Sequence, residues 1–272
     1  MWGFIKRHTR RIIQVVSTVL HNPLWGGFLS HKIYQGQLKS VCVPGLNCYS
    51  CPAAVGACPI GSLQQAMYAK KARYYVLGTL ILIGVTLGRV VCGFLCPFGL
   101  LQDLLYKIPF FKKINRFKAD RWLRWLKYVI LAVFVIILPL FFIDAPTFCK
   151  YICPQGTLQG GITLAPFIDV ALGFLYTWKV AILIVTLLLC LLIYRPFCKY
   201  ICPLGAIYGL FNRVAIVRLR IDKNKCTQCG ACAKVCKMCV DPVKHPNSIE
   251  CIRCGDCQHI CPHGAIKLGI KK

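Results

Sequence analysis

Acidic residues are scarce in this chain: Asp and Glu together number 8 among 272 residues, against 34 Lys and Arg. Charged residues of either sign make up only 15% of the sequence, hydrophobic residues make up 57%, and the mean hydropathy is +0.60. This balance excludes an ordinary soluble domain and predicts an α-helical membrane protein. The net charge of +26 does not indicate nucleic-acid binding, because the basic residues gather beside apolar runs, as on the cytoplasmic side of membrane proteins.

Several signatures of cofactor-binding and catalytic proteins are also missing. The sequence has no P-loop, no Rossmann glycine fingerprint, no Cys-x-x-Cys-His haem attachment and no paired histidines within its apolar runs. His21 stands alone near an apolar run, where a packing histidine is the simpler expectation. No small-residue cleavage site follows the basic start of the chain, so no cleavable signal peptide is expected.

Apolar runs predict four membrane-spanning helices, each close to the ~20 residues that a span requires. The runs are residues 12–29, 74–91, 128–143 and 170–194. The first is the weakest, because it contains His21, Asn22 and Pro23. We expect residues 1–215 to form a membrane domain and residues 216–272 to form a cytoplasmic ferredoxin-like domain.

The charges of the loops predict how these spans are oriented. Residues 107–127 hold eight Lys or Arg, whereas residues 144–178 hold only one basic residue, Lys150. The first loop should therefore be cytoplasmic and the second external, which makes the chain a multi-pass protein of the cytoplasmic membrane with both termini inside. Lys70, Lys71 and Arg73 conflict with this topology, because they would lie at the outer end of the second span.

Cysteine is abundant, with 20 residues, and much of it recurs in the phrase Cys-Pro-x-Gly. The phrase begins at Cys58, Cys96, Cys153 and Cys202. A further cysteine lies four residues upstream of the last three, and the first three continue into a Leu-Gln pair. Disulfides suit small secreted scaffolds, so repeated thiolate pairs beside apolar spans predict iron-sulfur clusters. On the expected topology, residues 58–99 and 153–205 are two parallel copies of one unit.

The C-terminal tail has the cysteine spacing of a bacterial two-cluster ferredoxin. It contains two runs of Cys-x2-Cys-x2-Cys-x3-Cys, in which the fourth cysteine of each run binds the cluster of the other. The spacing predicts one [4Fe–4S] cluster on Cys226, Cys229, Cys232 and Cys261, and a second on Cys251, Cys254, Cys257 and Cys236. Cys239 is an additional thiol, for which a spare buried cysteine is a simpler expectation than a substitute ligand.

Two more clusters are expected within residues 1–215. An inner cluster on the cytoplasmic side would be held by Cys92, Cys96, Cys198 and Cys202. An outer cluster would take Cys149 and Cys153, together with two cysteines from the stretch that holds Cys42, Cys48, Cys51 and Cys58.

The choice within that stretch stays open. We take Cys51 and Cys58 as metal ligands and keep Cys48 and Cys42 as further cofactor-binding candidates. A self-contained cluster on the four, or a disulfide that uses Cys42, are alternatives. Cys190 is expected to be a small core residue.

At Cys92-Gly93-Phe94-Leu95-Cys96-Pro97, at Cys198-Lys199-Tyr200-Ile201-Cys202-Pro203 and in the tail, the chain resembles the polyferredoxin-like membrane proteins with Cys-x3-Cys-Pro motifs. These are the NapH-type subunits associated with periplasmic nitrate reductase, the NosR-type carboxy-terminal modules and the FixG/CcoG-type proteins. The resemblance implies four spans, cytoplasmic ferredoxin clusters, and electron transfer between quinol or cytoplasmic carriers and an external redox partner. The Cys149–Cys153 pair and the cysteine-rich residues 42–58 depart from the NapH pattern.

We therefore expect transmembrane electron transfer from a cytoplasmic low-potential donor through the tail, inner and outer clusters to an extracytoplasmic partner, with the chain as a subunit of a larger membrane oxidoreductase complex. Basic residues of the tail, including Lys223, Lys225 and Lys234, suit an acidic donor protein. One alternative is a quinol dehydrogenase with a quinone between the spans. Another is a factor that handles or assembles iron-sulfur clusters, which predicts labile iron.

Overall fold

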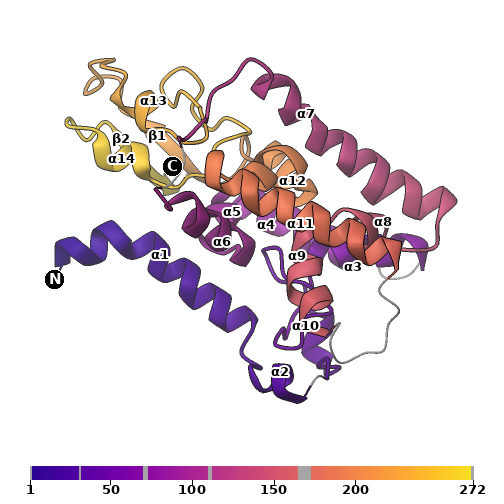
Figure 1. Ribbon diagram of the computed structural model, residues 1–272. Coiled ribbons are helices and arrows are strands. Elements are labelled where there is room, and N and C mark those ends of the chain that lie inside the picture. The colour runs from indigo at the N-terminus through magenta and orange to yellow at the C-terminus, as the bar shows by residue number, and fades with distance from the viewer. Residues whose placement is uncertain (1, 31, 70–72, 110–111, 165–172, 271–272) are drawn as a thin grey trace.

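The computed structural model describes residues 2–30, 32–69, 73–109, 112–164 and 173–270. In these residues the fold is helical, apart from one two-stranded antiparallel sheet in the tail. The sheet pairs β1 (Val217–Ile221) with β2 (Ile266–Ile270), and Leu219 lies opposite Leu268. Figure 1 shows the tail at one end of the molecule, with the short helices of the helical region, residues 1–215, packed beside it.

Within the described residues, two helices are long and apolar enough to cross a membrane. The first is α7 (Asp120–Ile130), which continues without interruption as a π-helical stretch, η2 (Leu131–Phe142). Pro139 lies inside this stretch and lacks an amide hydrogen, which favours a departure from regular α-helical bonding. The second is α11 (Phe174–Leu192). These helices cover most of the expected spans at 128–143 and 170–194, since the first ends at Phe142 and the second runs from Phe174 to Leu192. Residues 170–172 of the last span lie outside the described residues.

The other two expected spans differ in the structure. Residues 12–29 do not form one helix, because α1 (Trp2–His21) ends before Pro23 and α2 (Gly26–Ser30) is separate. The run at 74–91 is interrupted, because α4 (Arg73–Thr86) ends before a turn at Gly88, whose φ is +55°. A helix of this length extends about 21 Å, which is short for a hydrocarbon core of about 30 Å.

On helix α1, polar side chains face the protein and apolar side chains face outward, the reverse of a surface helix in a soluble protein. Gln14 and Ser17 are buried against the protein, whereas Val15, Val16 and Leu20 are exposed. The buried side is held by Gln14, which donates to Asp103 Oδ2 at 3.3 Å, and by Ser17, which donates to the Leu95 carbonyl at 3.0 Å. An outward apolar face is typical of a helix that contacts lipid or another apolar surface.

Each Cys-Pro-x-Gly phrase begins a helix in the same way. The cysteine is the N-cap residue with extended backbone angles, and the proline is the first helical residue, where its missing N–H costs nothing. The four helices are α3 (Pro59–Tyr68), α6 (Pro97–Tyr106), α9 (Pro154–Gly156) and α12 (Pro203–Phe211). Helix α9 continues as the π-helical η3 (Thr157–Gly161) and α10 (Ile162–Leu164).

A short element comes before each of these helices in the chain. The elements are the 3-10 helix η1 (Gln37–Ser40), α5 (Val90–Phe94), α8 (Thr147–Tyr151) and the π-helical η4 (Phe197–Ile201). Phe98 of α6 meets Phe197 of η4 edge to face, with ring centroids 5.1 Å apart. This contact joins the second phrase to the fourth in the main core.

The tail, which also contains α13 (Ala231–Val235) and α14 (Asp256–Ile260), is packed firmly on the helical region. Glu250 forms ion pairs with Arg89 at 3.1 Å and with Lys127 at 2.5 Å, and all three side chains are buried. Arg253 donates to the Asn212 carbonyl at 2.6 Å. The predicted domain boundary at 215/216 lies just before β1, yet the two parts share a buried polar interface.

Candidate metal centres

In the third and fourth Cys-Pro-x-Gly phrases the glycine donates its backbone N–H to the cysteine three residues earlier. The distances are 3.4 Å from Gly156 N to Cys153 Sγ and 3.3 Å from Gly205 N to Cys202 Sγ, whereas the side chains of Cys58 and Cys96 accept no such bond at their helix starts. The phrase is therefore a compact unit that places a sulfur at a helix start and, in two of its copies, supplies a hydrogen bond to it.

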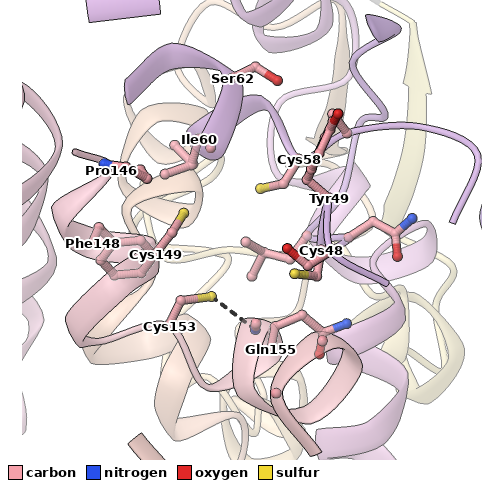
Figure 2. A pocket seen from close by; sticks show the side chains of 18 of the residues that line it. Cys48, Tyr49, Cys58, Ile60, Ser62, Pro146, Phe148, Cys149, Cys153 and Gln155 are labelled. Carbon is pink, nitrogen blue, oxygen red and sulfur yellow. Dashed lines mark hydrogen bonds between the residues drawn. The ribbon is translucent and has the colours of Figure 1, made fainter. Parts of the chain in front are cut away.

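Four cysteines surround a cavity of about 460 Å³, which we call the outer site. They are Cys48, Cys58, Cys149 and Cys153. In Figure 2 their sulfur atoms converge on one space from the loop before α3, the start of α3, α8 and the start of α9. Burial raises the pKa of Cys58 to about 11 and that of Cys153 to about 12, so thiolates here need a positive partner.

Glycines keep space beside these sulfur atoms. A methyl group added at Gly61 would lie 3.7 Å from Cys149 Sγ, and one at Gly160 would lie 3.6 Å from Cys48 Sγ. Among the described residues, no three His, Cys, Asp or Glu side chains converge on a position for a single metal ion. Four thiols around an open cavity instead fit a larger thiolate-bound group such as an iron-sulfur cluster.

The expected ligand Cys51 does not face the outer site. The Cys51 amide donates to the Cys48 carbonyl, and the resulting turn sends the Cys51 sulfur toward Asn22 Oδ1, 3.7 Å away. Cys48 takes its place, and its own amide donates to Gln159 Oε1 at 2.8 Å. Cys42 lies apart in a β-bridge with Ala57, so the structure does not gather a self-contained set of residues 42–58.

The alternative of a disulfide that uses Cys42 is not seen in the structure. All 20 cysteines are free, Cys42 among them. Cys190 is fully buried in α11, as expected of a core residue.

The inner site consists of the four expected cysteines, Cys92, Cys96, Cys198 and Cys202, all of them buried. Burial, followed by the neighbouring thiolates of Cys198 and Cys92, raises the pKa of Cys96 to about 12. The pKa of Cys202 is raised by burial and then by Cys198, Cys92 and Cys96. Cys92, Cys96 and Cys202 pack in one buried cluster, and Gln102 of the second phrase reaches Cys198.

Glutamines of the repeated Leu-Gln pair connect the phrases across the molecule. Gln64 Nε2 donates to Cys149 Sγ at 3.4 Å, and Gln102 Nε2 donates to Cys198 Sγ at 3.0 Å. The first phrase is thus bonded to the third and the second to the fourth. No role for these glutamines was predicted from the sequence, although they recur six residues after the cysteine of the phrase.

Two arginines were also missed as site residues. Arg89 and Arg195 are fully buried, and each lies three residues before the first cysteine of an inner pair. Arg89 Nη2 donates to the Cys198 carbonyl at 3.1 Å, and Arg195 Nη1 donates to the Cys92 carbonyl. Their matched position in the sequence was the signal.

The inner and outer sites are joined by residues 45–47. A methyl group added at Gly45 would lie 3.0 Å from Cys96 Cα, and Leu46 and Asn47 line the outer cavity together with Cys58. The Leu46 amide opposes the rise in the pKa of Cys96, and the Asn47 amide does the same for the pKa of Cys58, so consecutive amides face the two sites. The sequence put Cys58 and Cys96 at opposite ends of a span, but residues 44–48 fold back and reach both.

The tail has two cysteine groups, as the ferredoxin spacing predicts. Cys226, Cys229, Cys232 and Cys261 line one small cavity, the first tail site. The second tail site holds Cys236, Cys251, Cys254 and Cys257, and after burial, thiolates of Cys251 and Cys236 further raise the pKa of Cys257. Gly230 and Gly255 occupy matching positions with φ of +74° and +86°, a conformation that favours glycine and turns each run around its site.

The additional thiol, Cys239, lies beside the second tail site. Its Sγ donates to the Asn115 carbonyl at 3.1 Å, so its hydrogen is already used. Val240 N donates to Cys236 Sγ at 3.4 Å. Cys239 therefore has the contacts of a structural thiol.

Comparisons with known proteins agree with this cysteine chemistry. A family model described as a 4Fe-4S binding domain matches residues 74–118, 126–168 and 173–224. Each match contains one apolar helix followed by a Cys-x3-Cys-Pro motif. A second model of the same description matches residues 219–238 and 247–267 in the tail.

Two relatives come from Methanocaldococcus jannaschii. The uncharacterized protein MJ0749 is 31% identical over 68% of this chain and 66% of its own length. The uncharacterized protein MJ0750 is 30% identical over 70% of this chain and 76% of its own length. No solved structure matches the chain significantly. The family matches span both the helical region and the tail, so the chain belongs to the family of iron-sulfur proteins with 4Fe-4S binding domains.

Proposed function

We propose that this chain conducts electrons across a membrane, from a cytoplasmic low-potential donor through its four cysteine sites to a redox partner on the other side. The observation that carries the proposal is the contact between successive sites. When bound, iron-sulfur clusters supply reversible one-electron chemistry. The chain's own residues hold the thiolates in position, donate hydrogen bonds to sulfur and exclude water.

The tail and the inner site are in direct contact. A methyl group added at Gly93 would lie 2.5 Å from the Ile252 carbonyl oxygen, so the backbones beside Cys92 and Cys251 touch. The inner and outer sites are in turn linked through residues 45–47, because Gly45 packs against Cys96 Cα while Leu46 and Asn47 line the outer cavity. A continuous row of sites from tail to outer cavity supports a conduit rather than isolated structural centres.

Exposed apolar faces support a position in the membrane. Large apolar side chains are exposed on α1, α4, η2 and α11, among them Val16, Leu82, Phe141 and Leu188. Such faces are expected where lipid replaces water. Alkaline phosphatase fused after Asp144 should be active and a fusion at the C-terminus inactive; the reverse result would overturn the proposed orientation.

The test of the conduit uses the outer cysteines. In purified protein reconstituted in nanodiscs, about sixteen irons per chain are expected for four cubanes. Replacement of both Cys149 and Cys153 by Ser should remove one EPR signal and electron delivery to an external acceptor, while reduction of the tail persists. Replacement of Cys42 and Cys51 by Ser is the matched control, because neither lines the outer cavity. Unchanged spectra in the first variant, or about eight irons in the wild type, would refute the conduit.

A second candidate is quinol oxidation at the outer site. The outer cavity has the size of a ligand pocket and includes the apolar side chains of Pro146 and Leu164 beside the cysteines. This function predicts that a menaquinol analogue reduces the clusters of the purified protein. A lack of reduction by quinol, together with rapid reduction by a low-potential donor, would favour the conduit.

A further inference from the structure

We propose that Arg89 and Arg195 form a reciprocal pair of buried charges that raises the reduction potential of the inner centre, so that it accepts an electron before the outer centre does. The inference rests on the proposed cluster at the inner site and assigns a role that the cysteines do not have. Both arginines act through charge and position, without binding iron.

Each of the two arginines precedes one Cys-x3-Cys motif and bonds the backbone of the other motif. Arg89 precedes Cys92 but donates to the carbonyl of Cys198, and Arg195 precedes Cys198 but donates to the carbonyl of Cys92. Each guanidinium therefore ties one half of the site to the other. The arrangement needs arginine at both positions. Only the forked guanidinium can bond a carboxylate and the carbonyl of the opposite motif at the same time.

The glycines of the two inner phrases make room for this exchange. A methyl group at Gly99 would lie 3.2 Å from Arg195 Nη1, and one at Gly205 would lie 3.4 Å from Arg89 Nη2. A side chain at Gly99 would also meet the Cys92 carbonyl at 3.0 Å. Glycine at both positions thus admits the guanidinium. Gly205 also donates its amide to Cys202 Sγ.

Each arginine belongs to a buried group with more positive than negative charge. Arg89 shares Glu250 with Lys127, and Arg195 shares Asp103 with Arg10. One carboxylate therefore faces two cations on each side of the inner site. Arg89 Nε is buried and has no hydrogen-bond partner among the described residues, which leaves a donor uncommitted.

Among the described residues, the outer site has no such arginine pair. Pro146 occupies the position three residues before Cys149, and the outer cavity is lined by the partly exposed Lys179. The buried Lys39 lies outside this lining and bonds the carbonyls of Cys51 and Ala54, which are not part of the outer site. A reduced cluster carries one more negative charge than an oxidised one, and buried cations stabilise the extra charge most strongly where the dielectric is low. The inner centre should therefore have the higher potential of the two.

The experiment is an EPR-monitored redox titration of the full chain in nanodiscs, with iron content measured in parallel. In R195Q and R89Q we expect the midpoint potential of the inner signal to fall while the first tail and outer signals keep theirs. R195K, which retains the charge and loses the fork, should give a smaller fall. In wild type, the inner signal, identified by its loss in C198S, should appear at a higher potential than the outer one.

The matched control is K127Q. It removes a buried cation from the same carboxylate, Glu250, but from a side chain that touches no cysteine carbonyl. The inner potential should move much less than in R89Q. An equal shift in K127Q, or an intact inner signal at the wild-type potential in R89Q and R195Q, would overturn the inference. Loss of the inner signal in R195K as well as R195Q would also overturn it, because the role would be structural. Absence of an inner signal in the wild type would instead refute the proposed function.

Discussion

Single side chains around the cysteines do more than fill space. Gln64 and Gln102 each donate to a sulfur atom of a distant motif, and the two arginines bond the carbonyls of ligand candidates. Three of the few acidic residues, Asp103, Asp120 and Glu250, each pair with two buried or half-buried cations. Because cations outnumber carboxylates in these groups, the net charge beside the cysteines is positive, which suits negatively charged centres.

Asp103 gives a prediction at this scale. Its burial alone would raise the carboxyl pKa, but Arg195 and Arg10 outweigh burial and lower the pKa from 3.8 to about 2. The folded carboxyl binds its proton less readily than the unfolded one, so its contribution to stability is complete above pH 3.8 and is lost as the pH falls toward 2. D103N should lower the thermal midpoint near neutral pH by several degrees.

The check is thermal unfolding of D103N and wild type at a series of pH values. The difference between them should stay constant above pH 3.8 and narrow toward pH 2. A difference that is independent of pH over this window would contradict an ionised Asp103. D222N is the control, because Asp222 is exposed and its ion pair with Lys225 spans 3.9 Å at the surface.

Among the elements, the repeated unit is a helix that leads into a Cys-x3-Cys pair, followed by a second helix that begins at proline. Its short helices, α5 with α6 and η4 with α12, give the cysteines fixed positions within a turn of each other. The units then pack together where one backbone comes close to another, which requires glycine at the contact. Gly45 shows this, because a methyl group there would lie 3.0 Å from Cys96 Cα.

Gly93 of α5 gives a prediction for the contact between elements. A methyl group in G93A would meet the Ile252 carbonyl oxygen at 2.5 Å, so the tail must move away from α5. Electron transfer from the tail to the inner site should slow, and protease sensitivity near residues 212–216 should rise. Freeze-quench EPR after a pulse of reductant measures the first effect.

The comparison variant is G78A, on α4, where an added methyl group meets no atom within 4 Å. It should behave as wild type or be slightly more stable, since alanine favours helix over glycine. Equal transfer rates in G93A and wild type would mean that the tail contact is not part of the electron path.

At the scale of the whole molecule, positive charge gathers where the tail meets the helical region. An open cavity of about 380 Å³ lies there, lined by Cys236 of the second tail site and by four cations. The cations are Lys113, Arg116, Lys234 and Lys237. This surface supports docking of an acidic electron carrier directly beside the second tail site.

Salt dependence tests this docking. Reduction of the clusters by an acidic bacterial ferredoxin, followed by stopped-flow absorbance, should slow by about tenfold or more from low to high ionic strength. K234Q/K237Q should weaken that dependence, whereas reduction by dithionite should be unaffected. K223Q/K225Q is the control on the other basic part of the tail; if it has the larger effect, the donor docks at the first tail site instead.

The grouping of the tail cysteines could be predicted from the sequence, because ferredoxin motifs follow a local spacing of two and three residues. The grouping of the inner cysteines could be predicted as well, since the Cys-x3-Cys motif is local and only its partner is distant. Their role as cluster ligands stays a prediction. Apolar length correctly indicated the helices at 128–143 and 170–194. It overestimated those at 12–29 and 74–91, where Pro23 and Gly88 end helices that hydropathy alone would continue.

Tertiary structure decided which residues far apart in the sequence come into contact. Whether Cys48 or Cys51 faces the outer cavity is set by one turn and by Gln159, more than 100 residues away. The packing of the two halves brings Arg89 and Arg195 each to the opposite motif. It also places the amides of Leu46 and Asn47 between the inner and outer sites. Sequence by itself determined which thiols exist and how they are spaced; the fold determined which of them meet, because contacts between distant segments leave no local periodicity.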